Sequence, residues 1–164
     1  SLAHTNGGTM RVYLVRHGQA AAAVSDSARA LTPRGRDEAT ATASFMKQNR
    51  AQADAIWHSP KVRARETAEI LRDAGALGGE LIEHRGLLPE DDVSDVAIAI
   101  NAESTDLCVV GHLPHLSYLA SALLVGPNAN PFAVFNTATV LCIERSGPSR
   151  WHLVWFVSPD QLDR

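Results

Sequence analysis

The sequence predicts an α/β protein, namely a three-layer α/β/α sandwich on a mixed, mostly parallel sheet that ends in an antiparallel hairpin. Short apolar runs alternate with longer segments of helical periodicity over most of the chain, which is typical of α/β folds. Residues 107–110 show no alternation of apolar and polar side chains, which indicates a strand buried on both faces. Two strand-like runs separated by Ser146-Gly147-Pro148-Ser149 close the chain and predict the hairpin.

The N-terminal half is predicted from one mainly apolar run and from helix start and stop signals. Residues 11–15 are rich in β-branched and aromatic side chains, which predicts a buried strand. Thr32 supplies an N-cap and Pro33 the first position of a helix. The expected elements are a strand over 11–15, a loop over 19–32, a helix from Pro33 to about residue 49, a strand over 55–57, and a helix that starts just after Pro60, is ended by Gly75 and Gly78-Gly79, and buries Val62, Ala64, Ala68, Ile70 and Leu71.

The C-terminal half is predicted in the same way. Val93, Val96, Ala97 and Ile100 recur at helical spacing and define one apolar face. Gly111 ends the central apolar run, and a helix is expected soon after it. The expected elements are a short strand over 81–83, a helix over 92–100, a strand over 107–110, a helix over 115–124, and hairpin strands over 138–144 and 151–157.

Composition indicates one domain and argues against several classes of protein. With 164 residues, 45% of them hydrophobic, the chain is long enough for one core and short for two, so residues 10–164 are expected to form a single domain. A net charge of −3 without clustered Lys or Arg argues against nucleic-acid and membrane-surface partners, and no apolar run is long enough to span a bilayer. The polar, Gly-rich residues 1–9 before Met10 are expected to be an expression scar.

Both cysteines lie in apolar, strand-like runs. Cys108 is part of LCVV and Cys142 is part of VLCIE. We expect two reduced core residues rather than a disulfide or a metal pair. Together with the lack of a secretory signal pattern, this predicts a cytoplasmic location.

Polar side chains follow three of the predicted strands at the point where each strand ends. The first strand is followed by Arg16 and His17, the second leads to Arg63 at the start of a helix, and the run over 107–110 is followed by His112. The carboxyl ends of parallel strands meet at one edge of a sheet. We therefore expect these two arginines and two histidines to converge in one crevice.

This combination of residue types suits a phosphoryl group. A guanidinium binds phosphoryl oxygens in a bidentate manner, and imidazole N–H groups add further donors. The two cations also disfavour protonation of His17, so we expect a neutral ring with a nitrogen able to act as a nucleophile. Because phosphoryl transfer needs little beyond positioning and charge stabilisation, neither a metal nor another cofactor is expected. His112 and His115 are too few ligands for a metal site, and Pro114 lies between them.

Three stretches resemble signatures of the histidine phosphatase superfamily. They are Leu14-Val15-Arg16-His17-Gly18, similar to its Arg-His-Gly motif, Ser59-Pro60-Lys61-Val62-Arg63-Ala64-Arg65-Glu66-Thr67-Ala68, similar to its Ser-x-x-x-Arg-Ala-x-x-Thr motif, and Val109-Val110-Gly111-His112, similar to its third motif. The Leu31-Thr32-Pro33-Arg34-Gly35 helix start, the Gly-His-Leu-Pro turn and the Ser-Pro after the hairpin resemble the SixA branch, the phosphohistidine phosphatases. The resemblance covers nearly the whole chain and implies a phosphoglycerate mutase-like fold.

The resemblance also implies a role for each matching residue. His17 would be the nucleophile that becomes phosphorylated, and Arg16 and Arg63 would clamp the phosphoryl oxygens. His112 would donate a hydrogen bond to the same group, and the backbone N–H of Leu113 would add another. Water would then attack phospho-His17 and release inorganic phosphate.

The residue that protonates the leaving group is left open. Larger relatives such as the phosphoglycerate mutases use a glutamate in a Leu-x-Glu stretch, which Glu83 matches. Another register of the loop fits Glu90, Asp91 or Asp92 equally well. A phosphohistidine leaves as an imidazole with a pKa of about 6.5, so it needs far less protonation than an alkoxide.

The expected function is dephosphorylation of phosphohistidine on a phosphotransfer protein through a covalent phosphohistidine intermediate. The segments between the motifs are too short for the extra lobe with which relatives hold small metabolites, and an open pocket suits a residue displayed on a protein surface. Gln19 lies beside the nucleophile in the sequence and is expected to contact the substrate. Two alternatives stay open: a phosphatase for a small phosphorylated metabolite, and a non-catalytic module that binds phosphorylated partners.

Overall fold

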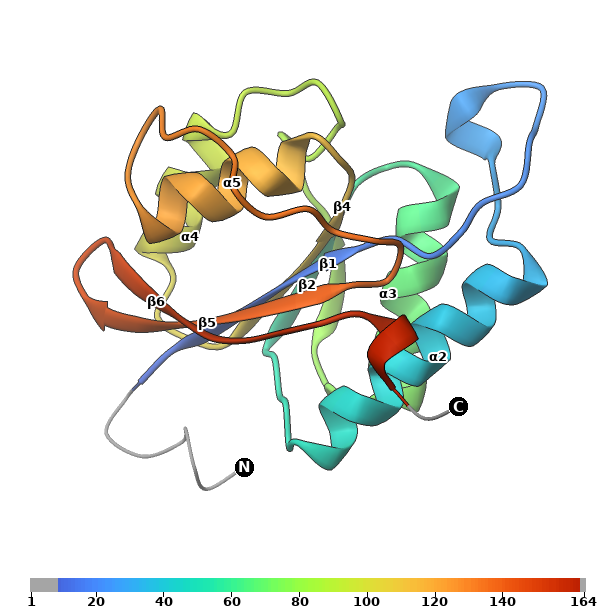
Figure 1. Ribbon diagram of the computed structural model, residues 1–164, viewed down its shortest axis with the longest axis horizontal. Coiled ribbons are helices and arrows are strands. Elements are labelled where there is room, and N and C mark those ends of the chain that lie inside the picture. The colour runs from blue at the N-terminus through green and yellow to red at the C-terminus, as the bar shows by residue number, and fades with distance from the viewer. Residues whose placement is uncertain (1–8, 163–164) are drawn as a thin grey trace.

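A six-stranded mixed sheet forms the middle of the computed structural model, which describes residues 9–162. Its strands are β1 (Arg11–Arg16), β2 (Ala55–His58), β3 (Glu80–Glu83), β4 (Leu107–Gly111), β5 (Val140–Gly147) and β6 (Arg150–Val157). Their order across the sheet is β3-β2-β4-β1-β5-β6. The first four are parallel, whereas β5 is antiparallel to β1 and β6 is antiparallel to β5 (Figure 1). The predicted mixed sheet and C-terminal hairpin are confirmed.

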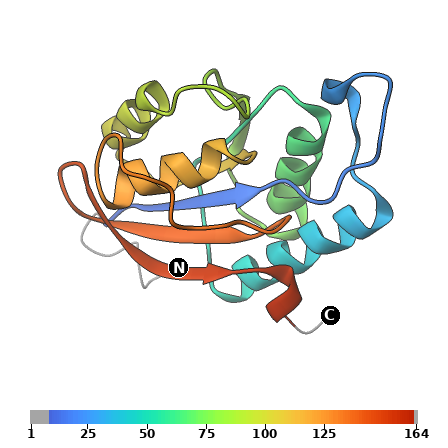
Figure 2. The same cartoon turned by 45° about the horizontal axis from the view of Figure 1, so that its top comes forward.

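Helices cover both faces of this sheet (Figures 1 and 2). They are α2 (Pro33–Gln48) and α3 (Val62–Ala74) on one face, and α4 (Ser94–Ala102) and α5 (His115–Leu124) on the other. Two short 3₁₀ turns, η2 (Asp26–Ala28) and η3 (Pro159–Gln161), complete the described elements. The protein is therefore the three-layer sandwich that the sequence predicts. The expected expression scar falls on residues 1–8, outside the described residues, and on residue 9.

Alternate residues of β1 belong to two separate hydrophobic cores. Val12 and Leu14 are fully buried in the cluster that contains the apolar side chains of α4 and α5. Tyr13 and Val15 are fully buried in the cluster that contains those of α2 and α3. A fully buried aliphatic side chain contributes about 1.5–3 kcal/mol to folding. Both helical layers are thus anchored on β1, the strand that leads into His17.

Two helices differ in detail from the prediction. The helix expected to begin at Asp92 begins at Ser94, because the Asp92 side chain accepts a hydrogen bond from the Ser94 N–H at 2.7 Å and forms a local turn there. In α3 the expected buried residues Val62 and Ile70 are only partly buried, whereas the polar residues Arg63 and Thr67 are buried. The prediction counted apolar residues only and therefore missed these two polar residues on the buried face of the helix.

The hairpin strands also differ at their ends from the prediction. β5 begins two residues later than expected, because Ala138 has a positive φ of 56° and donates its N–H to the His17 carbonyl at 3.0 Å. At the other end the strands continue through Gly147 and resume at Arg150, so the turn is shorter than the four residues expected.

The end of β1 and the start of α2 approach each other backbone to backbone. A Cβ at Gly18 would lie 2.5 Å from the Gly35 carbonyl oxygen, and a Cβ at Gly35 would lie 2.0 Å from the Gln19 carbonyl oxygen. Thr32 is the N-cap of α2, as predicted, and its hydroxyl oxygen accepts from the Gly35 N–H at 2.9 Å. Only glycine fits at these two positions, and the close approach fixes the residues next to His17.

Two further predictions concern membrane-spanning segments and the state of the cysteines. Within residues 9–162, no helix has both the length and the apolar character that crossing a bilayer requires. Cys108 of β4 and Cys142 of β5 are buried, unpaired thiols, as predicted.

Candidate active site

His17 lies immediately after β1 and is buried at the edge of the sheet. Its N–H donates to the Gly111 carbonyl at 3.1 Å. Its ring Nδ1 lies 2.6 Å from the Gly18 carbonyl oxygen. Because a carbonyl oxygen only accepts, Nδ1 carries the ring proton and Nε2 keeps its lone pair. The guanidinium of Arg63 donates from Nε to that Nε2 at 3.3 Å.

Burial keeps the His17 ring neutral. The pKa of His17 is lowered from 6.5 to about 4: burial is the largest cause, the Gly18 hydrogen bond opposes it, and the neighbouring guanidiniums of Arg63 and Arg16 add to it. We expected the two arginines to be the main cause, but burial is the larger one. At pH 7 the ring therefore presents an unprotonated Nε2.

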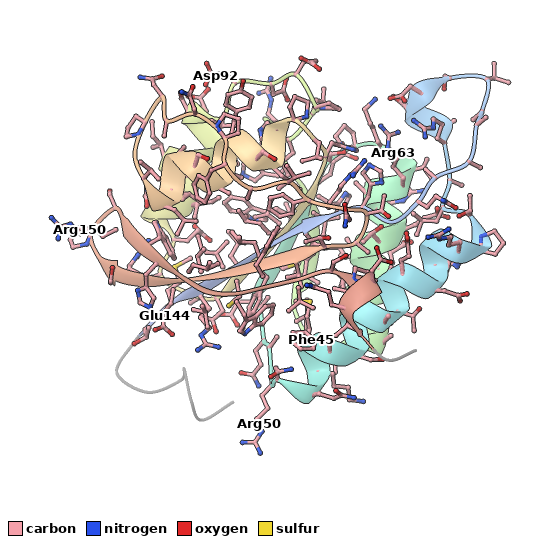
Figure 3. All side chains as sticks on the ribbon, viewed as in Figure 1. Phe45, Arg50, Arg63, Asp92, Glu144 and Arg150 are labelled. Carbon is pink, nitrogen blue, oxygen red and sulfur yellow. The ribbon has the colours of Figure 1, made fainter. Side chains whose placement is uncertain are left out.

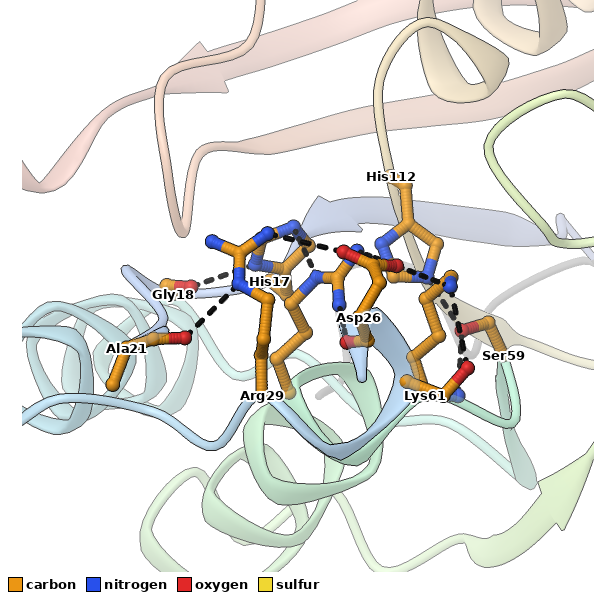
Figure 4. Close-up of polar contacts among 10 residues, drawn as sticks. His17, Gly18, Ala21, Asp26, Arg29, Ser59, Lys61 and His112 are labelled. Atoms are coloured by element: carbon orange, nitrogen blue, oxygen red, sulfur yellow. Dashed lines mark hydrogen bonds and ion pairs between the residues drawn. The ribbon is translucent and has the colours of Figure 1, made fainter. Parts of the chain in front are cut away.

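Arg63 lies in the first turn of α3 and is held by the η2 turn. Its Nη1 donates to the Asp26 carbonyl at 2.9 Å, and its Nη2 lies 3.3 Å from the Asp26 carboxylate. The same carboxylate pairs with Arg29 at 3.2 Å and with Lys61 (Figure 4). The Lys61 ammonium and the two guanidiniums hold the pKa of Asp26 far below its usual range. Asp26 lies in the segment predicted as a loop over 19–32, and it orients Arg63.

Arg16, the last residue of β1, is held from the other side. Its Nη1 donates to the Phe135 carbonyl, in the segment that leads to β5, at 2.8 Å. Burial lowers the pKa of Arg16, the Glu38 carboxylate raises it and the Arg63 guanidinium lowers it. Its Nε is buried and has no hydrogen-bond partner among residues 9–162.

His112 follows β4 and faces His17. The centroids of the two rings lie 5.0 Å apart, at an angle of 54°. The Nε2 of His112 lies 2.5 Å from the Ser59 hydroxyl, and its Nδ1 is buried without a partner among the described residues. Burial, then the neighbouring His17 and Arg63, lower the pKa of His112 to about 3. The structure thus brings together the four side chains that the strand ends were expected to supply.

Thr67 joins the two elements that carry His17 and Arg63. The Gly18 N–H donates to the Thr67 hydroxyl at 3.0 Å, and that hydroxyl donates to the Arg63 carbonyl at 2.8 Å. Both contacts are buried. This pair of hydrogen bonds explains why the motif around Arg63 needs a threonine one helical turn later.

Two of the four proposed proton donors have hydrogen-bond partners within their own loop, and the other two are exposed. The Asp91 carboxylate accepts from the Leu88 N–H at 2.9 Å, and Asp92 is bound to Ser94. Figure 3 shows Asp92 in the α4–α5 layer, well apart from Arg63. The Ser94 hydrogen bonds lower the pKa of Asp92, so this carboxyl is ionised and a poor acid at neutral pH. Glu83 and Glu90 are exposed, Glu83 at the end of β3 and Glu90 in the loop before α4.

Gln19 and the backbone N–H of Leu113 are the two other groups that were expected to contact the substrate. The Gln19 side chain accepts from the Thr32 hydroxyl at 2.8 Å, and the Gln19 N–H donates to Glu38 at 3.0 Å. Both bonds serve the start of α2, so a contact of Gln19 with substrate stays a prediction. Leu113 is half-buried directly after His112, and the Leu113–Pro114 peptide is cis.

Sequence reasoning missed Glu38. This carboxylate is 4% exposed, accepts the Gln19 N–H and lies 3.7 Å from Arg34. A signal was present, since Glu38 falls on the buried face of α2 together with Ala39 and Thr42. An acidic residue on an apolar helix face needs partners, and a cationic site nearby supplies them. Within the described part of the chain, no group of three His, Cys, Asp or Glu side chains could hold a metal ion.

Comparisons with known proteins define the class to which this site belongs. The family model of the histidine phosphatase superfamily (branch 1) matches residues 12–88. The chain is 32% identical over 158 residues to the phosphohistidine phosphatase SixA of Escherichia coli (strain K12), covering 93% of this chain and 96% of that protein. The chain belongs to the histidine phosphatase superfamily, and its resemblance to the SixA branch is confirmed.

Solved structures agree with this assignment. The protein histidine phosphatase SixA complexed with tungstate matches with a TM-score of 0.84 and 30% identity, over 92% of this chain and 98% of that chain. A phosphoglycerate mutase from Bacillus anthracis str. Sterne matches with a TM-score of 0.69 and 14% identity, over 89% of this chain and 92% of that chain. The second match shows a shared fold alone, which is the phosphoglycerate mutase-like fold that the resemblance implies.

Proposed function

We propose that this chain hydrolyses phosphohistidine on a phosphotransfer protein through a covalent phosphoenzyme formed on His17. The contacts of the His17 ring support the proposal most strongly. Its Nδ1 is held at 2.6 Å from the Gly18 carbonyl, and its Nε2 faces Arg63 Nε at 3.3 Å. A neutral nitrogen with a fixed direction, next to a guanidinium, is what attack on a phosphoryl group requires.

Four groups would bind the transferred phosphoryl group. The guanidiniums of Arg16 and Arg63 would take its oxygens, and His112 would donate from its ring. The backbone N–H of Leu113 would add a further donor. In this proposal the charge that develops on the phosphoryl oxygens is stabilised by these groups, and no metal ion or cofactor takes part.

The proposed reaction has two displacement steps. In the first, the lone pair of His17 Nε2 attacks phosphorus, the substrate N–P bond breaks, and the leaving imidazole takes a proton from solvent. In the second, water attacks phospho-His17, the His17 N–P bond breaks, and inorganic phosphate leaves as His17 regains its neutral ring. The two steps return the enzyme to its starting state.

Three observations favour phosphohistidine over a phosphate ester as the substrate. The carboxylates of Asp91 and Asp92 are bound to backbone N–H groups of their own loop, and an imidazole leaving group with a pKa of about 6.5 has the least need of a proton donor. The segment between Arg63 and His112 is occupied by α3, β3 and α4, which leaves no additional lobe for holding a metabolite. The relative from Escherichia coli is a phosphohistidine phosphatase by name.

The partner in this proposal is a phosphotransfer protein, and the product is inorganic phosphate. Neither nucleic acid nor a membrane is involved, because the net charge of −3 offers no general attraction to a polyanion. We place the reaction in the cytoplasm, where buried thiols such as Cys108 and Cys142 stay reduced.

Substrate preference can be tested by measuring the release of inorganic phosphate. A phosphotransfer domain carrying phosphohistidine is compared with a panel of sugar phosphates and nucleoside monophosphates. We expect the largest kcat/KM for the phosphoprotein and no release by His17→Ala. Hydrolysis of one ester orders of magnitude faster than the phosphoprotein would establish the metabolite phosphatase instead.

A further inference from the structure

Ser59 is a buried side chain at the edge of the sheet to which the reaction above gives no role. We propose that Ser59 is a positioning residue that holds His112 in the tautomer with its proton on Nδ1, so that Nδ1–H is donated to the phosphoryl group. That the phosphoryl group is the acceptor of this hydrogen bond rests on the proposed function. The tautomer is a property of the protein itself and can be measured without substrate.

The position of Ser59 follows from the sheet. Ser59 comes directly after β2 and His112 directly after β4, and these two strands are parallel neighbours with His58 opposite Val110. The Ser59 N–H donates to the Val110 carbonyl at 3.3 Å, which continues the strand pairing to this point. Both side chains are buried, with exposed fractions of 0% for Ser59 and 1% for His112. The pair is therefore fixed by neighbouring strands and shielded from water.

The hydrogen bond between the two side chains has a definite direction. Ser59 Oγ has two contacts among the described residues: it accepts from the Lys61 N–H at 3.2 Å and lies 2.5 Å from His112 Nε2. A serine hydroxyl has one hydrogen, and a backbone N–H cannot accept it. If Nε2 also donated to Ser59, both the hydroxyl hydrogen and the Nδ1 lone pair would be buried without partners, whereas the other tautomer leaves only the Nδ1–H unpaired; one buried unpaired group is unfavourable by about 1–3 kcal/mol. The hydroxyl therefore donates to His112 Nε2.

The direction of this bond determines where the ring proton of His112 lies. Since Nε2 accepts, it carries no hydrogen in the neutral ring, and the proton is on Nδ1. Burial keeps the ring neutral, because the pKa of His112 is lowered to about 3. The Nδ1–H is buried without a partner among residues 9–162. In Figure 4 this nitrogen is on the side of the ring that faces His17.

An unpaired donor facing the nucleophile suits an oxygen of the transferred phosphoryl group. Without the Ser59 hydroxyl, the Nε2–H tautomer would no longer be disfavoured, and in that tautomer Nδ1 presents a lone pair. A lone pair would repel the negative oxygens that the Nδ1–H attracts. Ser59 thus acts through His112 and does not touch the substrate. The same serine opens the motif that also contains Arg63 and Thr67.

The tautomer is measured first, in the wild-type protein. Two-bond ¹H–¹⁵N correlation spectra at pH 7 distinguish a ring protonated on Nδ1 from one protonated on Nε2. The chain has 7 histidines, and a His112→Gln variant assigns the signals of that residue. We expect the Nδ1–H form. An Nε2–H form in the wild-type protein would overturn the proposal, whatever the behaviour of any variant.

The second measurement removes the hydroxyl. In Ser59→Ala we expect the Nδ1–H population of His112 to fall and phosphoenzyme formation to slow about 10- to 100-fold, which is the effect of removing the partner that orients a metal-ligating histidine. Ser59→Thr restores a hydroxyl and should recover both the tautomer and much of the rate. An unchanged tautomer and rate in Ser59→Ala would contradict the proposal.

Ser121→Ala is the matched control. Ser121 is fully buried in α5, and its hydroxyl has no hydrogen-bond partner within the described part of the chain. We expect this variant to keep the wild-type rate and the wild-type spectrum of His112. A loss of rate equal to that of Ser59→Ala would show that removal of any buried serine loosens the site, and would overturn the specific role of Ser59.

These experiments also separate this inference from the proposed function. A wild-type protein with His112 in the Nδ1–H form but without any phosphoenzyme would refute the proposed function, and with it the phosphoryl group as the destination of the bond. A wild-type protein that phosphorylates His17 while His112 carries its proton on Nε2 would refute the role of Ser59 alone.

Discussion

The two arginines of the site come from different elements, and a backbone carbonyl oxygen holds each of them. Arg16 donates from Nη1 to the Phe135 carbonyl at 2.8 Å, and Arg63 donates from Nη1 to the Asp26 carbonyl at 2.9 Å. A guanidinium that is already fixed loses little further freedom when it binds an anion. It also stabilises developing charge without reorganisation. Both side chains are thus preorganised for the oxygens of a phosphoryl group at His17.

Removal of either guanidinium should therefore slow phosphoenzyme formation strongly. In Arg16→Ala and in Arg63→Ala we expect the rate constant from rapid-quench measurements to fall by about 10²-fold or more, as for other preorganised donors. The control is Arg36→Ala, whose exposed guanidinium lies 3.8 Å from Glu66, and whose rate should stay close to wild type. A near-wild-type rate in one of the two site variants would remove that arginine from the phosphoryl clamp.

The residues at the strand ends could be predicted from the sequence, but the residues that orient them could not. His17 and His112 directly follow apolar runs, so the sheet topology alone brings them to one edge. The contacts of Asp26 with Arg63 and Lys61 depend on the path of a loop of small residues over α3. No local pattern encodes that path. The role of Asp26 could therefore not be predicted from the sequence.

At the scale of elements, the segment between β1 and α2 is fastened at several points. An isolated bridge pairs Ala20 with Leu31, and the Leu31 N–H donates to the Glu66 carboxylate of α3 at 2.8 Å. Near its start, Gly18 and Gly35 allow the two backbones to approach closely. The segment thus has a defined position over α3, and η2 carries Asp26 to Arg63.

The close approach gives a prediction for stability. Gly35→Ala would place a Cβ 2.0 Å from the Gln19 carbonyl oxygen, so the backbone would have to move. In a helix, alanine is favoured over glycine by about 1 kcal/mol, whereas overpacking destabilises by about 1–3 kcal/mol. Because the contact is with backbone, we expect the clash to outweigh the helix propensity and the free energy of unfolding in urea to fall by up to about 2 kcal/mol.

Gly147→Ala is the control for this substitution. The new Cβ would lie 3.6 Å from the Arg150 side chain, an ordinary van der Waals contact. We expect a change in unfolding free energy below about 1 kcal/mol. Equal stability of the Gly35 variant and the wild type would contradict this prediction, because the end of β1 and the start of α2 could then separate without a loss of unfolding free energy.

Element types could be predicted well from the sequence because periodicity and caps are local signals. The Thr32-Pro33 start of α2 lies where it was predicted. The start of α4 was wrong by two residues, because the Asp92 side chain competes with the helix for the Ser94 N–H. The start of β5 was wrong because Ala138 bonds to His17, a contact distant in sequence.

At the scale of the whole molecule, the buried imidazoles connect the site to stability. The pKa values of His17 and His112 are lowered from 6.5 to about 4 and about 3, chiefly by burial. Between the unfolded and folded values of each ring, the unfolded chain binds a proton that the folded protein does not. Stability from these groups is therefore complete above about pH 6.5 and is lost as the pH falls towards 4.

We therefore expect the free energy of unfolding to fall on acidification from pH 7 to pH 4.5. Each such histidine contributes a slope of up to about 1.4 kcal/mol per pH unit. Urea titrations at a series of pH values measure the slope, and His17→Gln should make it shallower. A free energy of unfolding that stays constant between pH 7 and pH 5 would show that the two rings titrate normally in the folded protein.

The arrangement of the whole sheet could be predicted for a physical reason. The run over residues 107–110 has no polar residue and can only be placed between two helical layers, which is where β4 lies. A strand in that position has neighbours on both sides, and β1 and β2 are those neighbours. The convergence of His17 and His112 follows from this order. The sheet order does not show which acidic residue lies near the site, because Glu83 lies at the end of β3 and the other three candidates, Glu90, Asp91 and Asp92, lie in a loop.

The central claim is that Nε2 of His17 forms a bond to phosphorus. The most direct test incubates the protein with a ³²P-labelled phosphohistidine domain, quenches in alkali, and locates the label by mass spectrometry after proteolysis. We predict an alkali-stable, acid-labile phosphate on His17 that is absent from His17→Ala. Phosphate release without label on His17 would contradict the mechanism, and neither label nor release would leave the protein as a phosphate-binding module.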